Sequence, residues 1–267
     1  MPGSAQTFRS LHHQSPVLRL PNAWDAGSAR LFESLGATAI ATTSAGVAWA
    51  QGYADGRVFP VETAVSVAAS IARLIKVPLS VDLENGYSDD PLVVAEHVKR
   101  VLDVGAVGIN IEDGTDAPEL LARKIEAIKS MAARNGLDVF VNARTDVYLA
   151  GLVADELRVE ETLKRGRLYQ LAGADGLFVA ALVDVEQIKT IVAGVGLPIN
   201  LLARQGLPDA EALGQLGVRR LSAGSSIAQA LWGQAEQLAR GFLQDGRSEA
   251  VIETSLGYAQ IQALFVH

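Results

Sequence analysis

The stretch VPLSVDLENGY, residues 77–87, joins the pattern of a buried strand to a cluster of acidic residues. Its first half is almost entirely apolar, without the alternation that marks a strand with one face in water. Asp82 and Glu84 come where this strand ends, and Gly86 then breaks it. A strand covered on both faces predicts a parallel sheet, and enzymes built on closed parallel sheets place polar side chains at the carboxyl ends of the strands.

Eight runs along the chain share this near-continuous apolar pattern, and amphipathic segments of helical length lie between them. Several of these segments end in a glycine before the next strand, a typical helix stop. The pattern predicts an α/β protein with a single (β/α)8 TIM-type barrel. A doubly wound sheet is the alternative, but no G-x-G-x-x-G turn follows the first run. The runs are residues 17–23, 37–45, 77–84, 106–113, 138–146, 175–182, 197–203 and 218–224.

The chain is expected to form one domain, 1–267, with the barrel over about 17–240 and a C-terminal helical segment over about 241–267. Helix-like stretches after residue 225 exceed the one helix that would close a barrel, and they carry Leu and Phe on one face. An apolar face of this kind predicts contact with another subunit. An oligomer is therefore expected.

Composition narrows the class of partner. Apolar residues make up 49% of the 267 residues, the net charge is −7, and basic residues do not cluster, so neither nucleic acid nor a membrane surface is an expected partner. The absence of cysteine excludes disulfides and thiolate chemistry. No apolar run is long enough for a membrane helix, and residues 1–16 do not resemble a signal peptide. A cytoplasmic protein is expected.

Lysine and histidine are missing from the predicted strand ends. The six lysines fall on predicted helices or their edges, so a Schiff-base mechanism is not expected. The histidines also avoid the strand ends, which argues against a histidine-bound zinc or a histidine general base. They are predicted to be surface residues: His12, His13, His97 and His267.

Carboxylates dominate the strand ends instead. Asp82, Glu84 and Glu112 should meet at one barrel mouth, and Asp55 lies in a loop that could join them. Carboxylates crowded together repel one another unless a hard divalent cation lies between them, and Mg2+ suits such a site, with Mn2+ as a substitute. The alternative is helix capping, which is preferred for other acids: Asp89, Asp90 and Asp116.

Arg144 is the one strong cation expected at this mouth. A guanidinium can hold a carboxylate or an enolate oxygen with two hydrogen bonds, and the alternative is a salt bridge to Glu112 or Asp146. The small residues around Ser44 could offer backbone N–H groups to a substrate carboxylate, or could serve only tight packing.

The ordered motifs TTSAGVAWAQGYADG, SVDLENGY, GINIEDG and VNARTDVYLAG make the chain resemble the isocitrate lyase / phosphoenolpyruvate mutase superfamily over nearly its whole length. The resemblance implies a homodimer or homotetramer of barrels that swap a C-terminal helix between subunits, a Mg2+ ion, and a small 2-oxo acid or dicarboxylate as substrate. It makes Asp82 the direct metal ligand and Arg144 and Asp55 the candidate catalytic residues. The implied water-mediated metal contacts are Glu84, Glu112 and Asp55, and the implied substrate-binding residues are Thr43, Ser44, Ala45, Arg144 and Asn200.

The chain also departs from the superfamily. It lacks the K-K-C-G-H loop of the isocitrate-type lyases, and the segment that follows Glu112 is short. These departures argue against isocitrate cleavage by the usual route and against the mutase reaction. The predicted function is a Mg2+-dependent lyase that cleaves a C–C bond or decarboxylates a 2-oxo acid or its adduct through an enolate. The alternatives are a 2-oxo acid-binding protein without turnover, a phosphonopyruvate- or oxaloacetate-type hydrolase, and a phosphate-handling barrel enzyme using SAGSS, residues 222–226.

Overall fold

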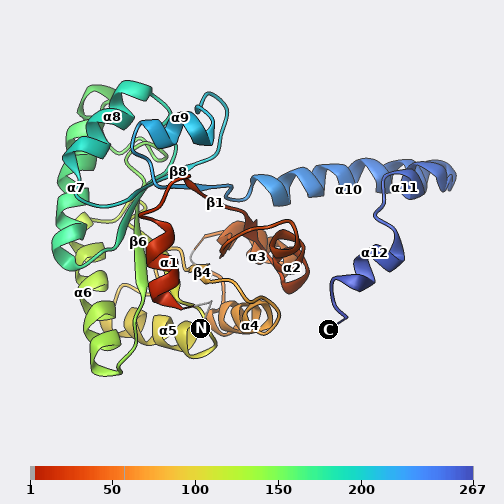
Figure 1. Ribbon diagram of the computed structural model, residues 1–267, viewed down its shortest axis with the longest axis horizontal. Helices are drawn as coiled ribbons and strands as arrows, with labels where there is room; N and C mark the ends of the chain where they lie inside the picture. Colours follow the sequence, from red (N-terminus) through yellow and green to blue (C-terminus); the bar gives the residue numbers. More distant parts are fainter. Residues whose placement is uncertain (1–3, 57, 267) are drawn as a thin grey trace.

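A nearly closed barrel of nine parallel strands forms the centre of the molecule (Figure 1). The computed structural model describes residues 4–56 and 58–266. Each of the eight predicted runs contains a strand, and the first run contains two. The strands are β1 (Leu18–Leu20), β2 (Asn22–Ala23), β3 (Ile40–Thr42), β4 (Leu79–Asp82), β5 (Gly108–Glu112), β6 (Phe140–Thr145), β7 (Gly176–Val179), β8 (Ile199–Leu202) and β9 (Arg220–Ser222).

The barrel closes at the first predicted run, residues 17–23, where one continuous stretch of chain supplies both edge strands. The strand order is β1-β9-β8-β7-β6-β5-β4-β3-β2, so β1 pairs with β9 while β2 pairs with β3. Only Pro21 separates β1 from β2. Proline has no N–H for a ladder hydrogen bond, which accounts for the break in an otherwise continuous strand. The predicted eight-stranded TIM-type barrel is confirmed.

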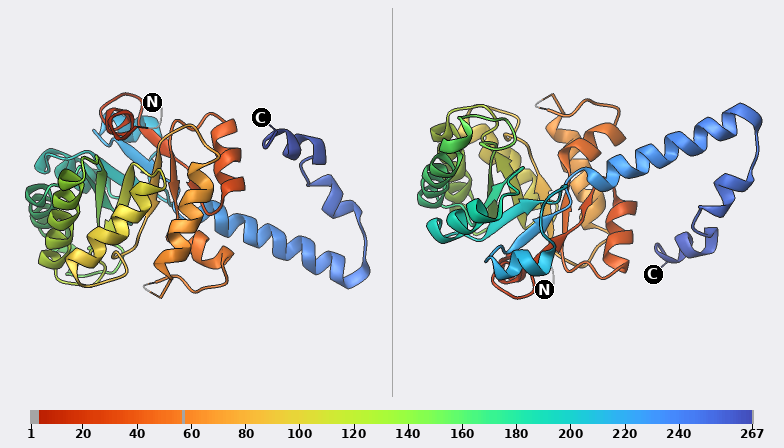
Figure 2. Two further views of the ribbon diagram at one scale, coloured as in Figure 1. Left: turned by 90° about the horizontal axis from the view of Figure 1, so that it is seen from below. Right: turned by 90° about the horizontal axis from the view of Figure 1, so that it is seen from above.

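Helices surround the barrel and fall where the amphipathic segments predict them (Figures 1 and 2). Gly36, Gly105 and Gly173 follow three of these helices with φ of 93°, 112° and 103°, the left-handed conformation that a helix-ending glycine adopts. The helices are α1 (Ala5–Leu11), α2 (Ala26–Ser34), α3 (Ser44–Ala50), α4 (Val61–Ala72), α5 (Pro91–Asp103), α6 (Pro118–Arg134), the short 3-10 helix η1 (Asp155–Leu157), α7 (Arg158–Ala172), α8 (Val185–Gly194), α9 (Ala210–Gln215), α10 (Ser226–Asp245), α11 (Glu249–Glu253) and α12 (Tyr258–Ala263).

The pleat of each strand separates an apolar outer face from a polar inner face. Ile109 and Ile111 of β5 are fully buried in the main core between strands and helices. The residues between and after them, Asn110 and Glu112, point the other way because successive side chains of a strand alternate. The register places Asn110 beside Asn142 and Glu112 beside Arg144 on β6. Polar side chains from several strands therefore line the interior.

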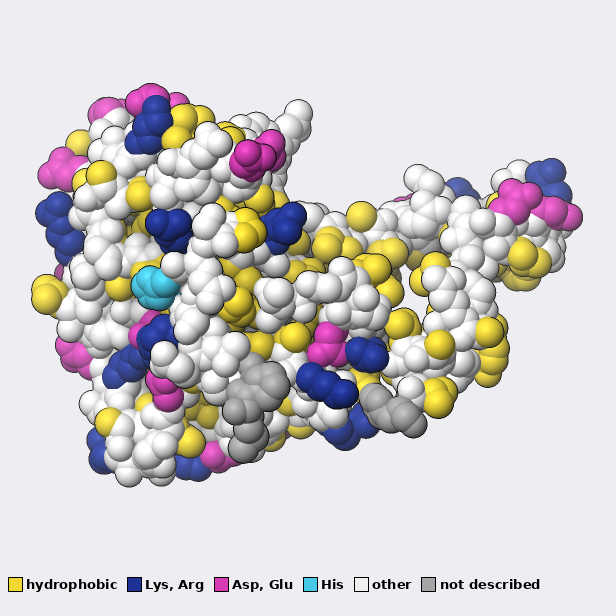
Figure 3. Space-filling view, viewed as in Figure 1, with side chains coloured by type: hydrophobic (Ala, Val, Ile, Leu, Met, Phe, Trp, Pro, Cys, Tyr) yellow, Lys and Arg dark blue, Asp and Glu magenta, His cyan; other side chains and the backbone are white. Residues whose placement is uncertain are grey.

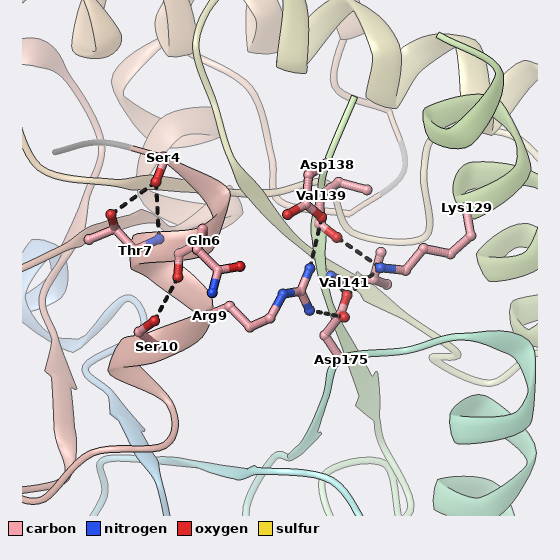
Figure 4. A network of polar contacts seen from close by, with 10 residues as sticks. All are labelled: Ser4, Gln6, Thr7, Arg9, Ser10, Lys129, Asp138, Val139, Val141 and Asp175. Carbon is pink, nitrogen blue, oxygen red and sulfur yellow. Dashed lines mark hydrogen bonds and ion pairs between the residues drawn. The ribbon is translucent and has the colours of Figure 1, made fainter. Parts of the chain in front are cut away.

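Helix α1, which the sequence pattern does not predict, covers the amino-terminal end of the barrel. Phe8 is fully buried and meets Phe140 edge-on at 5.3 Å between ring centroids. Arg9 pairs with Asp138 and Asp175, and Lys129 also reaches Asp175, so ionic contacts fasten the helix to the barrel floor (Figure 4). This end of the barrel is closed, and a ligand has to enter from the opposite end.

His12 corrects the prediction of surface histidines. Its ring is buried and stacks on Phe140 at 4.1 Å, and Nδ1 lies 2.8 Å from the carbonyl oxygen of Phe8. Burial lowers the pKa of His12 to about 3, so the ring is neutral and packs as an aromatic side chain. His13 is exposed as predicted, His97 is half-buried, and His267 lies outside the described residues.

Helices α10, α11 and α12 form an arm: α10 extends away from the barrel, and α11 and α12 lead the chain back, where the carbonyl of Leu264 accepts from Arg30 Nε of α2 at 2.8 Å (Figures 1 and 2). Ala228 is the buried residue of α10, whereas Trp232 is 57% and Leu243 83% exposed. Hydrophobic side chains gather along this arm (Figure 3). Exchange of this arm between subunits stays a prediction. Within residues 4–56 and 58–266, no helix combines the length and apolar character needed to cross a membrane.

Candidate active site

Asp82 ends β4 at the open mouth of the barrel, held by the strand and helix beside it. Its N–H donates to Thr42 Oγ1 at 2.8 Å, and its Oδ2 accepts from the backbone N–H of Ser44 at 3.3 Å. The backbone of Asp82 is therefore held by the end of β3, and its carboxylate by the start of α3. This position agrees with the strand end that the sequence predicts.

The predicted turn of small residues is the first turn of α3. Thr43 is the N-cap, and its Oγ1 accepts from the N–H of Gly46 at 3.4 Å. A Cβ added to Gly46 would come within 2.7 Å of Thr43 Cγ2 and 3.1 Å of Trp24 Cβ. Tight packing thus does require small residues here. The same turn also directs the Ser44 N–H at Asp82, so both interpretations of this turn have structural support.

Glu84 lies just past β4 on a backbone that few residues other than glycine adopt. Its φ is 51°, and φ is 60° at Tyr87 three residues later. The carbonyl of Glu84 accepts from Glu112 N–H at 2.8 Å, which extends the β4–β5 pairing beyond the strand ends. Left-handed conformations of non-glycine residues cost roughly 1–3 kcal/mol each and concentrate at functional sites. The strained loop brings Glu84, whose side chain is buried, to the same mouth as Asp82.

Arg144 lies between two carboxylates. Its Nη1 is 2.8 Å from Glu112 Oε2, while Nε and Nη2 donate to Asp146 at 2.7 and 3.0 Å. Its guanidinium also lies 5.8 Å from the centre of the Phe178 ring. The predicted salt bridges are therefore present, and they hold the guanidinium in a fixed orientation at the mouth.

The pKa shifts show that the acids act on one another. Burial raises the pKa of Glu112 to about 8; Arg144 opposes the shift, whereas Asp82, Asp146 and Glu84 increase it. Burial also raises the pKa of Asp82, again against Arg144, and Asp55 adds to the increase.

Tyr87 reports on the same acids. Burial raises its pKa first, and four carboxylates raise it further: Glu84, Asp82, Asp55 and Glu112. All four predicted metal residues thus act on one phenol. A divalent cation would relieve their mutual repulsion, so the residues present fit a hard metal ion.

Asp55 lies farther out than the other three acids, exposed in the loop between α3 and α4. Within the described part of the chain, no group of three or more His, Asp or Glu side chains is arranged to hold a metal ion directly. A site with one direct carboxylate and several water-mediated ones does not require such a group, because Mg2+ keeps much of its water. Asp82 as the direct metal ligand stays a prediction.

Asn200 lies on β8, in register with the strand that carries Phe178. It is fully buried, and its Oδ1 accepts from Ser222 Oγ at 3.2 Å. Its register partner on β7 is Phe178, the residue against which Arg144 lies. The structure therefore places Asn200 on the side of the barrel that carries Arg144.

Asp113 is a buried carboxylate to which sequence reasoning assigned no role. It links the mouth of the barrel to α7. It accepts from Arg165 Nη1 at 2.9 Å, from Tyr169 Oη at 2.6 Å and from the N–H of Asp146 at 2.9 Å. In the sequence, the i, i+4 spacing of Arg165 and Tyr169 on one helix was the feature that could have indicated a shared partner. Asp113 thereby supports the segment that holds Arg144.

Comparisons with known proteins agree with this architecture. The sequence model of the phosphoenolpyruvate phosphomutase family matches residues 8–243. The chain belongs to this family. It thus lies in the isocitrate lyase / phosphoenolpyruvate mutase superfamily, as its motifs suggest.

Relatives in the family include both uncharacterised proteins and enzymes. An uncharacterised protein of Mycobacterium tuberculosis (strain H37Rv) is 39% identical over 264 residues, 97% of this chain and 96% of that protein. The oxaloacetate decarboxylase of Pseudomonas entomophila (strain L48) is 30% identical over 220 residues, 79% of this chain and 75% of the enzyme.

Solved structures share the fold. A protein of Burkholderia cenocepacia J2315, named as a candidate lyase or mutase, superposes with a TM-score of 0.90 at 31% identity, covering 100% of this chain and 96% of that one. A phosphonopyruvate hydrolase in complex with oxalate and Mg2+ has a TM-score of 0.84 at 22% identity over 97% of this chain and 94% of that one. The second match supports the fold alone.

Proposed function

We propose that the protein is a Mg2+-dependent lyase that cleaves a C–C bond of a small 2-oxo acid or dicarboxylate, with oxaloacetate decarboxylation as the leading reaction. The observation that carries the proposal is the meeting of Asp82, Glu84 and Glu112 with the oriented guanidinium of Arg144 at this end of the barrel. The named relatives that act on oxaloacetate favour the same substrate class.

The chain's own residues account for binding. Asp82 would hold the ion directly, with Glu84, Glu112 and Asp55 acting through its water molecules. A bound Mg2+ or Mn2+ ion polarises the carbonyl and carboxylate oxygens of an oxo acid. The first turn of α3, Thr43–Ala45, would direct backbone N–H groups at the substrate carboxylate, as it already does at Asp82.

Arg144 supplies the electrostatic part of the reaction. When the bond between the methylene carbon and the leaving carboxylate of oxaloacetate breaks, its electron pair passes toward the carbonyl oxygen and CO2 leaves. Negative charge then builds on that oxygen, and a preorganised guanidinium nearby lowers the energy of this state by roughly 3–4 kcal/mol. The methylene carbon takes up a proton to give pyruvate. No protein nucleophile is required.

Two contacts argue against alternative reactions. The turn after β9 is a poor phosphate site, because the N–H of Gly224 already donates to Asn22 Oδ1 at 2.8 Å. Lys124 does not serve as a free amine, since its Nζ donates to the carbonyl of Asn85 at 2.9 Å. Decarboxylation, which needs neither a phosphate site nor an amine, fits these contacts.

A turnover screen with product analysis tests the proposal. The protein is incubated with Mg2+ and oxaloacetate, a 2-methylmalate-type acid or phosphonopyruvate, and products are followed by NMR. Pyruvate and CO2 from oxaloacetate support the lyase; oxalate with acetate, or pyruvate with phosphate from phosphonopyruvate, indicates the hydrolase. Tight oxalate binding without turnover of any substrate indicates a binding protein.

The metal ion itself decarboxylates oxaloacetate slowly, so the screen needs matched variants. Asp82→Asn should reduce the rate to that of free Mg2+. Asp103→Asn, an exposed carboxylate on α5, should leave it unchanged. Equal rates for the wild type and Asp82→Asn would refute the proposed function.

A further inference from the structure

A connected group of polar side chains fills the barrel interior below the acids. The group comes from four strands, and each member is at most 3% exposed. Its centre is Arg220, a fully buried arginine of β9 that sequence reasoning did not single out. The members are Asn110, Asn142, Asn200, Arg220 and Ser222.

Arginine fixes the direction of every hydrogen bond in this group, because a guanidinium can only donate. Arg220 Nε donates to Ser222 Oγ at 3.0 Å. The hydroxyl proton of Ser222 is then directed onward to Asn200 Oδ1 at 3.2 Å. In this arrangement the oxygen of the Asn200 amide faces Ser222, and its NH2 group faces away from it.

The other side of the guanidinium is anchored as well. Arg220 Nη2 donates to Asn110 Oδ1 at 3.2 Å, and the same oxygen accepts from Asn142 Nδ2 at 2.9 Å. These contacts hold the plane of the guanidinium so that Nε faces Ser222. A rotation of Arg220 that released Ser222 would also break the bond to Asn110.

Holding a cation here is unfavourable for the fold. Burial lowers the pKa of Arg220 to about 9, and Asp82 is the one carboxylate among the described residues whose charge acts in the opposite direction. An apolar side chain of similar volume usually stabilises such a position better than a buried charge does. A requirement of packing alone therefore does not explain Arg220.

The amide at the end of this chain of contacts has a free donor. Asn200 Nδ2 is buried and has no hydrogen-bond partner among the described residues. Leaving a buried donor unpaired costs folding free energy, so a donor kept in one orientation is best explained by a partner that arrives with a ligand. Asn200 adjoins Phe178, against which Arg144 lies.

We infer that Arg220 and Ser222 are positioning residues that orient the Asn200 amide, so that its NH2 group donates to an oxygen of the bound oxo acid. This inference rests on the proposed function for the nature of the ligand. It assigns Arg220 and Ser222 to substrate recognition through their effect on Asn200. The relay is the sequence of contacts Arg220–Ser222–Asn200.

A double-mutant cycle tests the relay through the Kd of oxalate, measured by calorimetry at saturating Mg2+. Ser222→Ala should weaken oxalate binding about 10-fold in the wild-type background and less than about 2-fold in an Asn200→Ala background, because its effect passes through Asn200. Ser222→Thr keeps the hydroxyl and should retain most of the affinity. Ser80→Ala, another buried inner-face serine, is the matched control and should change neither background.

Arg220→Met separates positioning from folding. It should weaken oxalate binding as Ser222→Ala does, while its melting temperature stays equal to that of the wild type or rises. Equal loss from Ser222→Ala in both backgrounds would overturn the relay, and so would unchanged oxalate affinity in Asn200→Ala.

NMR signals of the 15N-labelled side-chain amide of Asn200 distinguish failure of the relay from failure of the proposed function. They should shift in Ser222→Ala and Arg220→Met without any ligand, and stay in place in Ser80→Ala. If the wild type binds neither Mg2+ nor oxalate, the proposed function fails. In that case the amide signals alone test the relay, and the relay is refuted if they shift in neither Ser222→Ala nor Arg220→Met.

Discussion

Mg2+ binding should strengthen steeply as the pH rises from 6 to 8, because the buried acids must lose protons before they can hold a cation. Burial raises the pKa of Glu112 to about 8, and the repulsion of Asp82, Asp146 and Glu84 contributes. A carboxyl with that pKa is ionised in about 1% of molecules at pH 6 and in about half of them at pH 8. The apparent affinity for Mg2+ should therefore rise by at least about 50-fold over this range.

Calorimetry in buffers of different ionisation enthalpy measures both the affinity and the protons released. At pH 7 the binding of one Mg2+ should release about one proton, since Glu112 is then about 90% protonated in the metal-free protein. Glu112→Gln removes the group that carries this proton. Both the proton release and the pH dependence should shrink in that variant.

A surface carboxylate provides the control for this measurement. Glu186→Gln alters an exposed side chain of α8 that pairs only with Lys189. It should leave the affinity and the proton release as they are in the wild type. The reasoning is refuted if wild-type Mg2+ affinity is the same at pH 6 and pH 8 and no protons are released at pH 7.

Four further outcomes follow from the same contacts. In EDTA, the free energy of unfolding should fall by about 2 kcal/mol from pH 6.5 to pH 8, because folded Glu112 keeps a proton there that the unfolded chain has lost; urea titrations that show a rise would contradict this. Asp82→Ala should weaken Mg2+ binding by more than the roughly 10- to 100-fold typical of outer-shell partners, with an unchanged circular dichroism spectrum, and unchanged affinity would exclude Asp82 as the ligand. Arg144→Ala should weaken oxalate binding by about 30- to 1,000-fold, because charged hydrogen bonds to the ligand are lost. Mg2+ binding should stay equal or tighten, because a competing cation is gone. A parallel loss of both affinities would contradict the assignment. Light scattering should find a dimer or tetramer, and Trp232→Asp on the exposed face of α10 should shift it toward the monomer, whereas a monomeric wild type would rule out the exchanged arm.

Strand positions could be predicted from the sequence because each parallel strand is buried on both faces. Continuous apolar runs such as 106–113 therefore identify both the strands and their order, and the polar residues that follow them identify the mouth. Helix α1 was not predictable in this way, since its contacts with Phe140 and Asp175 come from residues distant in the chain. The buried position of His12 has the same origin.

Only the site residues at the strand ends could be predicted from the sequence. Asp82, Glu112 and Arg144 lie at strand ends, where polarity after an apolar run is conspicuous. Asn110 and Arg220 lie within or at the start of their strands and could have been noticed as polar residues in otherwise buried runs. Their partners could not be inferred, because the barrel register brings β5 next to β6 but also places Arg220 of β9 across the interior from Asn110.

The charges at the mouth explain why a metal ion and an arginine are both needed. Arg144 already donates to Asp146 and Glu112, so its single positive charge does not by itself balance these two acids, Asp82 and an incoming oxo acid. In the absence of a cation the site compensates by protonation, which is the meaning of the raised pKa of Glu112. A divalent ion replaces those protons, and its positive charge then offsets the substrate carboxylate. Metal and substrate should consequently bind with positive coupling, and oxalate affinity measured without Mg2+ should be far lower than with it.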